Sequence, residues 1–203
     1  YPSEMGIVST SQAIQCLGGY GYSDEFPVEQ YMRDARIHPI HEGTTGIQGM
    51  DLLGRKVTMK NGKAFGLYLE EIAKTVNEAK SHTGLAGHAA RLGEAVEIQK
   101  KVTGSLVEHA MKGEIERFLA DATLYLEMAG VICIAWQWLM QGVVARRALD
   151  AGASGDGRTF MEGKLCTMRY FFEYELPAVD GLSRRLMSAD APTIEMKAEH
   201  FDD

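Results

Sequence analysis

The stretch Met128-Ala-Gly-Val-Ile-Cys-Ile-Ala-Trp-Gln-Trp-Leu-Met-Gln-Gly-Val-Val-Ala145 contains no charged residue, although charged residues make up 24% of the chain. It lies inside a longer predicted helix, Glu114 to Ala151, that is apolar on nearly every side. Such a helix is either the buried core of a bundle or a membrane span. Because the stretch is of marginal length for a span and contains Gln137 and Gln141, a buried core helix is favoured and no membrane span is expected.

Amphipathic segments surround this core helix in the sequence. Apolar residues recur at helical spacing in four of them, over residues 65–80, 85–111, 158–176 and 178–186. In the first segment, the residues expected to face inward are Leu69, Ile72, Ala73 and Val76. No stretch shows a sustained alternation of apolar and polar residues, so no strand is predicted. The chain is therefore predicted to be all-α, with an antiparallel helix bundle.

The first sixty residues form a separate pattern of shorter helices. Helices are expected over residues 5–17, from Pro27 to just before Pro39, and from Thr44 or Thr45 to near Asn61-Gly62. The glycine-rich segment 18–24 between the first two is expected to be a turn. The composition changes near residue 62, which predicts a helical part at 1–61, a helical bundle at 62–187 and an acidic tail at 188–203.

Charge and cysteine content exclude several classes of function. The net charge of -7 and the pI near 5.4 argue against a broad nucleic-acid surface, because phosphates are neutralised by clustered Lys and Arg. Three widely spaced cysteines indicate neither a disulfide framework nor a zinc site. The N-terminal residues lack the pattern of a signal peptide. A cytoplasmic location is the simplest expectation.

Two motifs that suggest ligands are better explained as ordinary structure. Gly152-Ala-Ser-Gly-Asp-Gly157 resembles a phosphate-binding loop, but Arg158 replaces the required lysine and a helix, not a strand, precedes it. His38 and His41 suggest metal binding, but Pro39 separates them and no further ligand is near in sequence. We therefore expect a helix-to-helix linker at the first motif and no metal at the second.

The stretch Ile40-His-Glu-Gly-Thr-Thr-Gly-Ile-Gln48 contains the strongest candidate for chemistry. Glu42 lies between a proline-containing extended segment and a Gly-Thr-Thr turn that is expected to start a helix. A carboxylate at such a place is suited to act as a base. Most glutamates are simply solvated, so Glu42 needs support from the rest of the chain.

That support comes from an ordered series of motifs. They are Gln15-Cys-Leu-Gly18-Gly19-Tyr-Gly21-Tyr22, Glu25-Phe-Pro27-Val-Glu29, Arg33-Asp34-Ala35-Arg36-Ile37 and Ile40-His-Glu42-Gly43-Thr44. In this order and spacing, the series strongly resembles the C-terminal helical domain of the acyl-CoA dehydrogenase family. Residues from about 64 onward resemble, less specifically, the helical extension of longer members such as the methylthiopropanoyl-CoA dehydrogenase type.

The resemblance implies roles for the residues around Glu42. Glu42 matches the family's catalytic base, which removes the α-proton of an acyl-CoA thioester while FAD accepts a hydride from the β-carbon. Gly43 matches a position where the backbone approaches substrate and flavin closely, and His41 matches a position near the acyl chain. Thr44 matches a position that contacts the flavin bound to the same subunit. Arg33 and Asp34 are interpreted as a structural ion pair or cap.

A second set of residues matches another part of the cofactor. Gln15, Gly18 and Gly19 match the segment that contacts the adenosine diphosphate portion of FAD bound to a neighbouring subunit. The resemblance therefore implies a homo-oligomer, an acyl-CoA substrate and an electron-transfer flavoprotein as acceptor.

Two alternatives stay open at the level of sequence. An acyl-CoA oxidase, in which oxygen reoxidises the flavin, would carry the same motifs. The family's N-terminal helical domain and β-domain, which supply most of the flavin and acyl-CoA pocket, do not occur in this chain. The chain alone is therefore expected neither to hold FAD tightly nor to turn over, and a non-catalytic helical module for self-association is a further possibility.

Overall fold

The computed structural model describes residues 1–201, and within that range every regular element is a helix. This confirms the predicted all-α class. The elements are α1 (Pro2–Leu17), α2 (Gly19–Tyr22), α3 (Val28–Ala35), α4 (Thr45–Met50), η1 (Asp51–Lys56), α5 (Met59–Lys80), α6 (Ala86–Met111), α7 (Ile115–Leu119), α8 (Ala122–Asp150), α9 (Gly155–Tyr170), η2 (Phe171–Glu175), α10 (Ala178–Leu186), α11 (Pro192–Glu195) and η3 (Ala198–Phe201).

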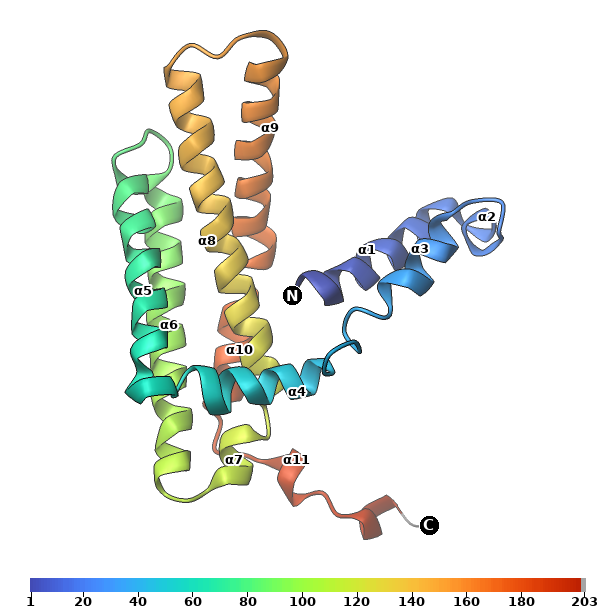
Figure 1. Cartoon of the computed structure of the whole chain (residues 1–203), viewed down its shortest axis with the longest axis vertical. Helices are drawn as coiled ribbons and strands as arrows, with labels where there is room; N and C mark the ends of the chain where they lie inside the picture. The colour runs from blue at the N-terminus through green and yellow to red at the C-terminus, as the bar shows by residue number, and fades with distance from the viewer. Residues whose placement is uncertain (202–203) are drawn as a thin grey trace.

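The chain consists of an arm and a bundle (Figure 1). The arm is formed by α1, α2 and α3, in which α1 and α3 pack side by side and α2 lies at the tip. The bundle is formed by α5, α6, α8, α9 and α10, with α5 and α6 forming one antiparallel hairpin and α8 and α9 another. The continuous helix α4–η1 crosses the bundle near its lower part and connects it to the arm.

The core of the bundle forms around α8, as its apolar sequence predicts. The α8 side chains of Tyr125, Ile132 and Leu139 are fully buried. Residues of the surrounding helices that are also fully buried are Leu53, Ile72, Leu92, Val102 and Phe172. Burying side chains of this size contributes about 1.5–3 kcal/mol each. One predicted core position is wrong, because Ala73 is exposed and the inward stripe of α5 includes Thr75 and Ala79 instead.

Close approach of backbones fixes α4 against α8. A Cβ atom at Gly49 would lie 2.8 Å from the main-chain carbonyl oxygen of Ala122, so only glycine permits this distance. Further along the same continuous helix, Leu53 and Val57 are buried. Ile47 and Met50 are 52% and 42% exposed, because α4 begins beside the bundle and the helix reaches the core only at η1.

Several predicted boundaries require correction. The expected single helix over 114–151 breaks at residues 120 and 121 into α7 and α8, and the Asp121 carboxylate binds Arg185 of α10. The glycine-rich turn at 18–24 contains the short helix α2. The linker expected at 152–157 is shorter, because α9 starts at Gly155. The helix end near Asn61-Gly62 is confirmed by left-handed backbone angles at residues 60–62.

Within residues 1–201, one helical stretch at 115–150 is long and apolar enough to cross a membrane by length and composition alone. Core helices of bundles meet the same criterion, and α8, which forms most of this stretch, packs against α4, α5, α6, α9 and α10. Its burial in the bundle accounts for its apolar composition.

Candidate functional site

Glu42 lies in the segment 36–44 that connects the arm to α4. The helix α3 ends at Ala35, earlier than the expected stop before Pro39, and a series of turns follows. Glu42 adopts a left-handed conformation with φ of 56°, and Gly43 follows with φ of 105°. A left-handed glutamate is uncommon and costs roughly 1 kcal/mol, so surrounding contacts must hold it.

Three hydrogen bonds hold this turn. The side-chain amide of Gln48 donates to the main-chain carbonyl of Glu42 over 2.8 Å. The Thr45 main-chain N–H donates to the carbonyl of Pro39 over 3.1 Å, and the Thr45 hydroxyl donates to the carboxylate of Glu4 in the first turn of α1. The Glu42 turn is therefore tied to both α4 and the arm.

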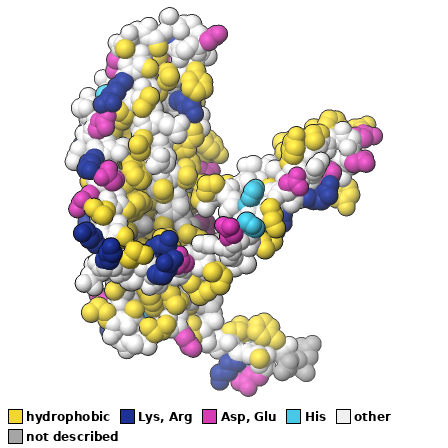
Figure 2. All heavy atoms as spheres, viewed as in Figure 1, with side chains coloured by type: hydrophobic (Ala, Val, Ile, Leu, Met, Phe, Trp, Pro, Cys, Tyr) yellow, Lys and Arg dark blue, Asp and Glu magenta, His cyan; other side chains and the backbone are white. Residues whose placement is uncertain are grey.

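The Glu42 side chain itself is exposed. Among residues 1–201, no side chain forms a hydrogen bond or ion pair with its carboxylate. Figure 2 shows histidine side chains beside an acidic one where the arm meets the bundle, and His38 and His41 belong to this connection. A catalytic base requires partial enclosure, and the described part of the chain leaves Glu42 open on its solvent side.

Thr44 occupies the N-cap position of α4, with extended backbone angles of φ -63° and ψ 162°. Its position at the helix start is as predicted. Its hydroxyl makes no capping hydrogen bond, and the residue is exposed, so the hydroxyl is free to contact a bound molecule. His41 is likewise exposed, in the turn before it.

Gln15, Gly18 and Gly19 lie together at the tip of the arm. The Gly18 N–H donates to the Gln15 carbonyl over 3.2 Å, and Gly18 turns the chain from α1 into α2 with φ of 60°. All three residues are exposed. An open surface depression of about 390 Å³ at the tip is lined by Gly19, Tyr20, Ser23 and Glu25.

The two sets of candidate residues lie at opposite ends of the arm. Figure 1 places α2 at the tip and the connection to α4 at the base. The structure therefore does not bring Gln15, Gly18 and Gly19 together with Glu42 inside one chain. Between the two ends, Arg33 forms an ion pair with Glu29 at 2.8 Å, not with Asp34. Because Arg33 and Glu29 are one helical turn apart, this pair belongs to the surface of α3.

Two residues that position the Glu42 turn were not identified from the sequence. Gln48 follows the N-cap Thr44 by four residues, one position beyond the spacing of a capping box, and it donates to a carbonyl instead of accepting from the N-cap N–H. No standard local pattern therefore indicates its role. Glu4 lies 41 residues from its partner Thr45, and no local pattern indicates such a contact.

No group of three or more His, Cys, Asp or Glu side chains within residues 1–201 has the arrangement of a metal site. The histidines at 38 and 41 therefore do not gather ligands from other elements in this part of the chain.

Comparisons with known proteins cover almost the entire chain. Residues 1–57 match the family described as acyl-CoA dehydrogenase, C-terminal domain, and residues 68–197 match the family described as acetyl-CoA dehydrogenase C-terminal like. The proposed division between residues 61 and 62 falls between these two matches and stays a prediction.

Relatives with similar sequences carry related names. The broad-specificity linear acyl-CoA dehydrogenase FadE5 of Mycobacterium tuberculosis is 29% identical over 98% of this chain and 33% of its own length. A butyryl-CoA dehydrogenase of Syntrophomonas wolfei is 31% identical over 99% of this chain and 33% of its own length. The 3-methylmercaptopropionyl-CoA dehydrogenase of Ruegeria pomeroyi is 33% identical over 86% of this chain and 29% of its own length.

The chain thus spans about a third of the length of these relatives. Both family matches describe C-terminal domains, and together they account for the arm, the connection at Glu42 and the bundle. The chain belongs to the acyl-CoA dehydrogenase family and corresponds to the C-terminal helical part of such enzymes.

Proposed function

We propose that this chain supplies the C-terminal helical part of an FAD-dependent acyl-CoA dehydrogenase in fatty acid metabolism, and that Glu42 is its catalytic base. The observation that carries the proposal is the Glu42 turn, where a left-handed backbone and the Gln48 hydrogen bond hold an exposed carboxylate that no described side chain pairs with. The relatives' names support a thioester of coenzyme A as the substrate.

The proposed reaction converts an acyl-CoA to the trans-2-enoyl-CoA. Glu42 takes the proton from the α-carbon, and the electron pair of that C–H bond becomes part of the new carbon–carbon double bond. FAD, when bound, accepts the hydride from the β-carbon. Negative charge on the thioester oxygen needs hydrogen-bond donors in the transition state. The Glu42 main-chain N–H has no acceptor among residues 1–201 and is available for that purpose.

The candidate FAD residues fit contacts to two cofactors rather than one. The arm tip offers the exposed Gln15 amide and the backbones of Gly18 and Gly19, which suits close approach of a nucleotide, and Gly19 also lines an open surface depression. The arm base offers the free hydroxyl of Thr44. Because these ends are separated by the length of the arm, we assign the tip to FAD bound to a neighbouring subunit and the base to FAD bound to the same subunit.

Exposed apolar residues on the arm support an assembly of subunits. Val8, Leu17, Tyr31 and Ile37 are between 39% and 57% exposed in the single chain. Covering apolar surface of this kind is favourable. A purely non-catalytic oligomerisation module would have the same surface, so the Glu42 turn is the feature that distinguishes an enzyme from such a module.

The proposal is tested with a full-length enzyme that contains this chain. Adding acyl-CoA thioesters of increasing length should bleach the bound flavin and produce the 2-enoyl-CoA. No bleaching with any thioester would contradict the proposal. Following hydrogen peroxide in the same reactions separates the dehydrogenase from the oxidase, because only an oxidase passes its electrons directly to oxygen. Electron-transfer flavoprotein as acceptor and a cytoplasmic location stay predictions that these reactions do not address.

A further inference from the structure

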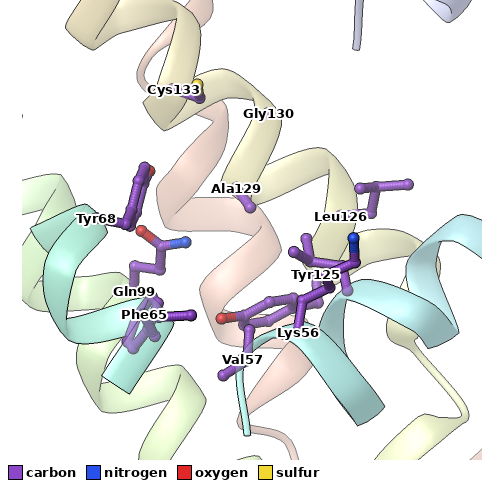
Figure 3. Close-up of a pocket in the computed structure, with 12 residues that line it drawn as sticks. Lys56, Val57, Phe65, Tyr68, Gln99, Tyr125, Leu126, Ala129, Gly130 and Cys133 are labelled. Atoms are coloured by element: carbon purple, nitrogen blue, oxygen red, sulfur yellow. The ribbon is translucent and has the colours of Figure 1, made fainter. Parts of the chain in front are cut away.

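A partly enclosed pocket of about 360 Å³ lies in the bundle, and none of the candidate catalytic or FAD residues lines it. Its walls come from η1, α5, α6 and α8, and Figure 3 shows their side chains converging on it. Most of the lining is apolar, including Val57, Phe65, Leu126 and Ala129. An apolar cavity of ~150 Å³ is sufficient to bind benzene, so this pocket has room for roughly twice that amount of hydrocarbon.

One wall of the pocket carries buried polar groups that lack partners. Gln99 of α6 is only 2% exposed, and its Oε1 atom accepts no hydrogen bond within residues 1–201. The Tyr68 hydroxyl of α5 is buried beside the Gln99 side chain, but the two groups lack the distance and angles of a hydrogen bond with each other. By contrast, the hydroxyl of Tyr125 forms a 2.7 Å hydrogen bond with that of Thr103. Buried polar groups are nearly always hydrogen-bonded, so the pair at Gln99 and Tyr68 needs an explanation.

Figure 3 shows Gln99 extending toward Tyr68 and Tyr125 at this polar wall. Burial raises the pKa of Tyr68, and the neighbouring Gln99 amide opposes that rise. The Tyr68 hydroxyl therefore stays protonated at neutral pH and can donate as well as accept a hydrogen bond. Rotation about the terminal torsion of Gln99 exchanges its oxygen and nitrogen, which lets the amide present either an acceptor or a donor to the pocket.

We propose that this pocket binds a medium-length alkyl chain that ends in an uncharged hydroxyl group, with the hydroxyl hydrogen-bonded to Gln99 and Tyr68. The alkyl chain lies along Phe65, Leu126 and Ala129 toward the opening. The hydroxyl donates to the Gln99 oxygen and accepts from Tyr68, so both unpartnered groups are satisfied by one ligand atom.

The charge of the lining favours an uncharged ligand. Lys56 contributes the one ionic side chain of the lining; this side chain is about half exposed, and its ammonium group lies 3.9 Å from the Asp51 carboxylate. No cationic side chain of the lining lies at the polar wall to balance a buried carboxylate, and burying an unpaired charge is strongly unfavourable. The pocket is lined by none of the candidate catalytic or FAD residues, so this inference does not depend on the proposed enzymatic function.

Cys133 provides a direct readout of occupancy, because it lines the pocket and is half-buried while Cys16 and Cys166 are exposed. The three thiols are alkylated with iodoacetamide, and each rate is measured by peptide mass spectrometry with 1-octanol, octanoate or octane present. We expect 1-octanol to slow alkylation of Cys133 in a saturable manner and to leave Cys16 and Cys166 unchanged. Octanoate should protect only at concentrations about tenfold higher. Equal protection by octanoate and 1-octanol, or none by 1-octanol, would overturn the proposal.

Two variants separate hydrogen bonding from simple filling of the pocket. Gln99→Leu should weaken the protection of Cys133 by 1-octanol about tenfold, because it removes the polar partner of the hydroxyl. Octane should protect Cys133 equally well or better, because leucine keeps the volume of the side chain. Ala129→Leu should weaken protection by both ligands, because its larger side chain takes up part of the pocket. Circular dichroism confirms that each variant is folded. If folded Gln99→Leu binds 1-octanol as the unsubstituted chain does, the assigned hydrogen bond is wrong.

Discussion

The side-chain amide of Gln48, in the first turn of α4, donates a 2.8 Å hydrogen bond to the main-chain carbonyl of Glu42. This bond spans the turn in which Glu42 and Gly43 both have positive φ. It holds the backbone of the proposed base without engaging its carboxylate. The orientation of Glu42 therefore depends on Gln48.

Replacing Gln48 should impair catalysis more than stability. In Gln48→Leu the donor is lost, and we expect kcat of the full-length enzyme to fall about tenfold or more, because small displacements of a catalytic group are costly. Stability should fall by only about 1 kcal/mol, since the bond is exposed. Steady-state kinetics and thermal unfolding measure the two effects. Gln30→Leu, at an exposed position on α3, is the control and should change neither.

Gly43 should not tolerate a side chain. Its φ is 105°, and a Cβ atom there would lie 2.9 Å from the Gln48 amide nitrogen. Gly43→Ala should therefore destabilise the chain by about 1–2 kcal/mol and disturb the Glu42 turn. The matched control is Gly46→Ala within α4, where a Cβ atom would meet only the Thr123 hydroxyl oxygen, at 3.9 Å, and alanine favours the helix. Urea unfolding of both variants tests this, and equal stability of the two would contradict the account.

The buried hydroxyl pair of Tyr125 and Thr103 should contribute to the stability of the bundle. Their hydroxyl oxygens are 2.7 Å apart, and the Thr103 hydroxyl also donates to the main-chain carbonyl of Gln99 over 2.7 Å. Tyr125→Phe should cost about 1 kcal/mol, because the threonine keeps a second partner. Leu139→Ala in the same helix should cost about 2–5 kcal/mol, because it opens a cavity in the core. A larger loss from Tyr125→Phe than from Leu139→Ala in chemical unfolding would show that the hydroxyl pair matters more than packing.

His88 should make the bundle sensitive to mild acid. Burial lowers its pKa from the usual value of 6.5, and its Nδ1 atom has no hydrogen-bond partner within residues 1–201. Arg91, Arg169 and Glu173 are the charged groups that also act on it. The unfolded chain therefore takes up the proton first as the pH falls.

The stability contributed by neutral His88 is thus fully present above about pH 6.5 and is lost as the pH falls through the folded pKa. Urea unfolding at pH 7.5 and 5.5 should show a loss that His88→Leu reduces, because leucine can still pack on Phe172 and does not titrate. An unchanged pH dependence in the variant would exclude His88 as a cause.

The sequence was sufficient to predict the ends of those helices that local signals such as proline mark. The helix at 178–186 has both predicted ends, because Pro177 precedes it and its apolar spacing is regular. The break between α7 and α8 was missed, because neither glycine nor proline marks Ala120 and Asp121. Asp121 instead binds Arg185, 64 residues away, and such contacts leave no local pattern.

In the candidate site, too, some features could be predicted from the sequence and others could not. Motif order singled out Glu42 and the glycines of the arm, whose roles stay predictions, and the positive φ angles at Glu42 and Gly43 show a tight turn there. The link from Glu4 to Thr45 could not be predicted, because it depends on how the arm folds back toward α4. The unpartnered Gln99 in the bundle was also beyond prediction, since its burial comes from packing between helices distant in sequence.

The central claim is tested most directly by Glu42→Gln in a full-length enzyme that contains this chain. The substitution keeps the size of the side chain and the main-chain bond from Gln48 but removes the base. We expect flavin content to be retained and the rate of flavin bleaching by acyl-CoA to fall by roughly 10²–10⁴-fold, the usual contribution of a general base. A bleaching rate equal to that of the unsubstituted enzyme would show that Glu42 is not the base.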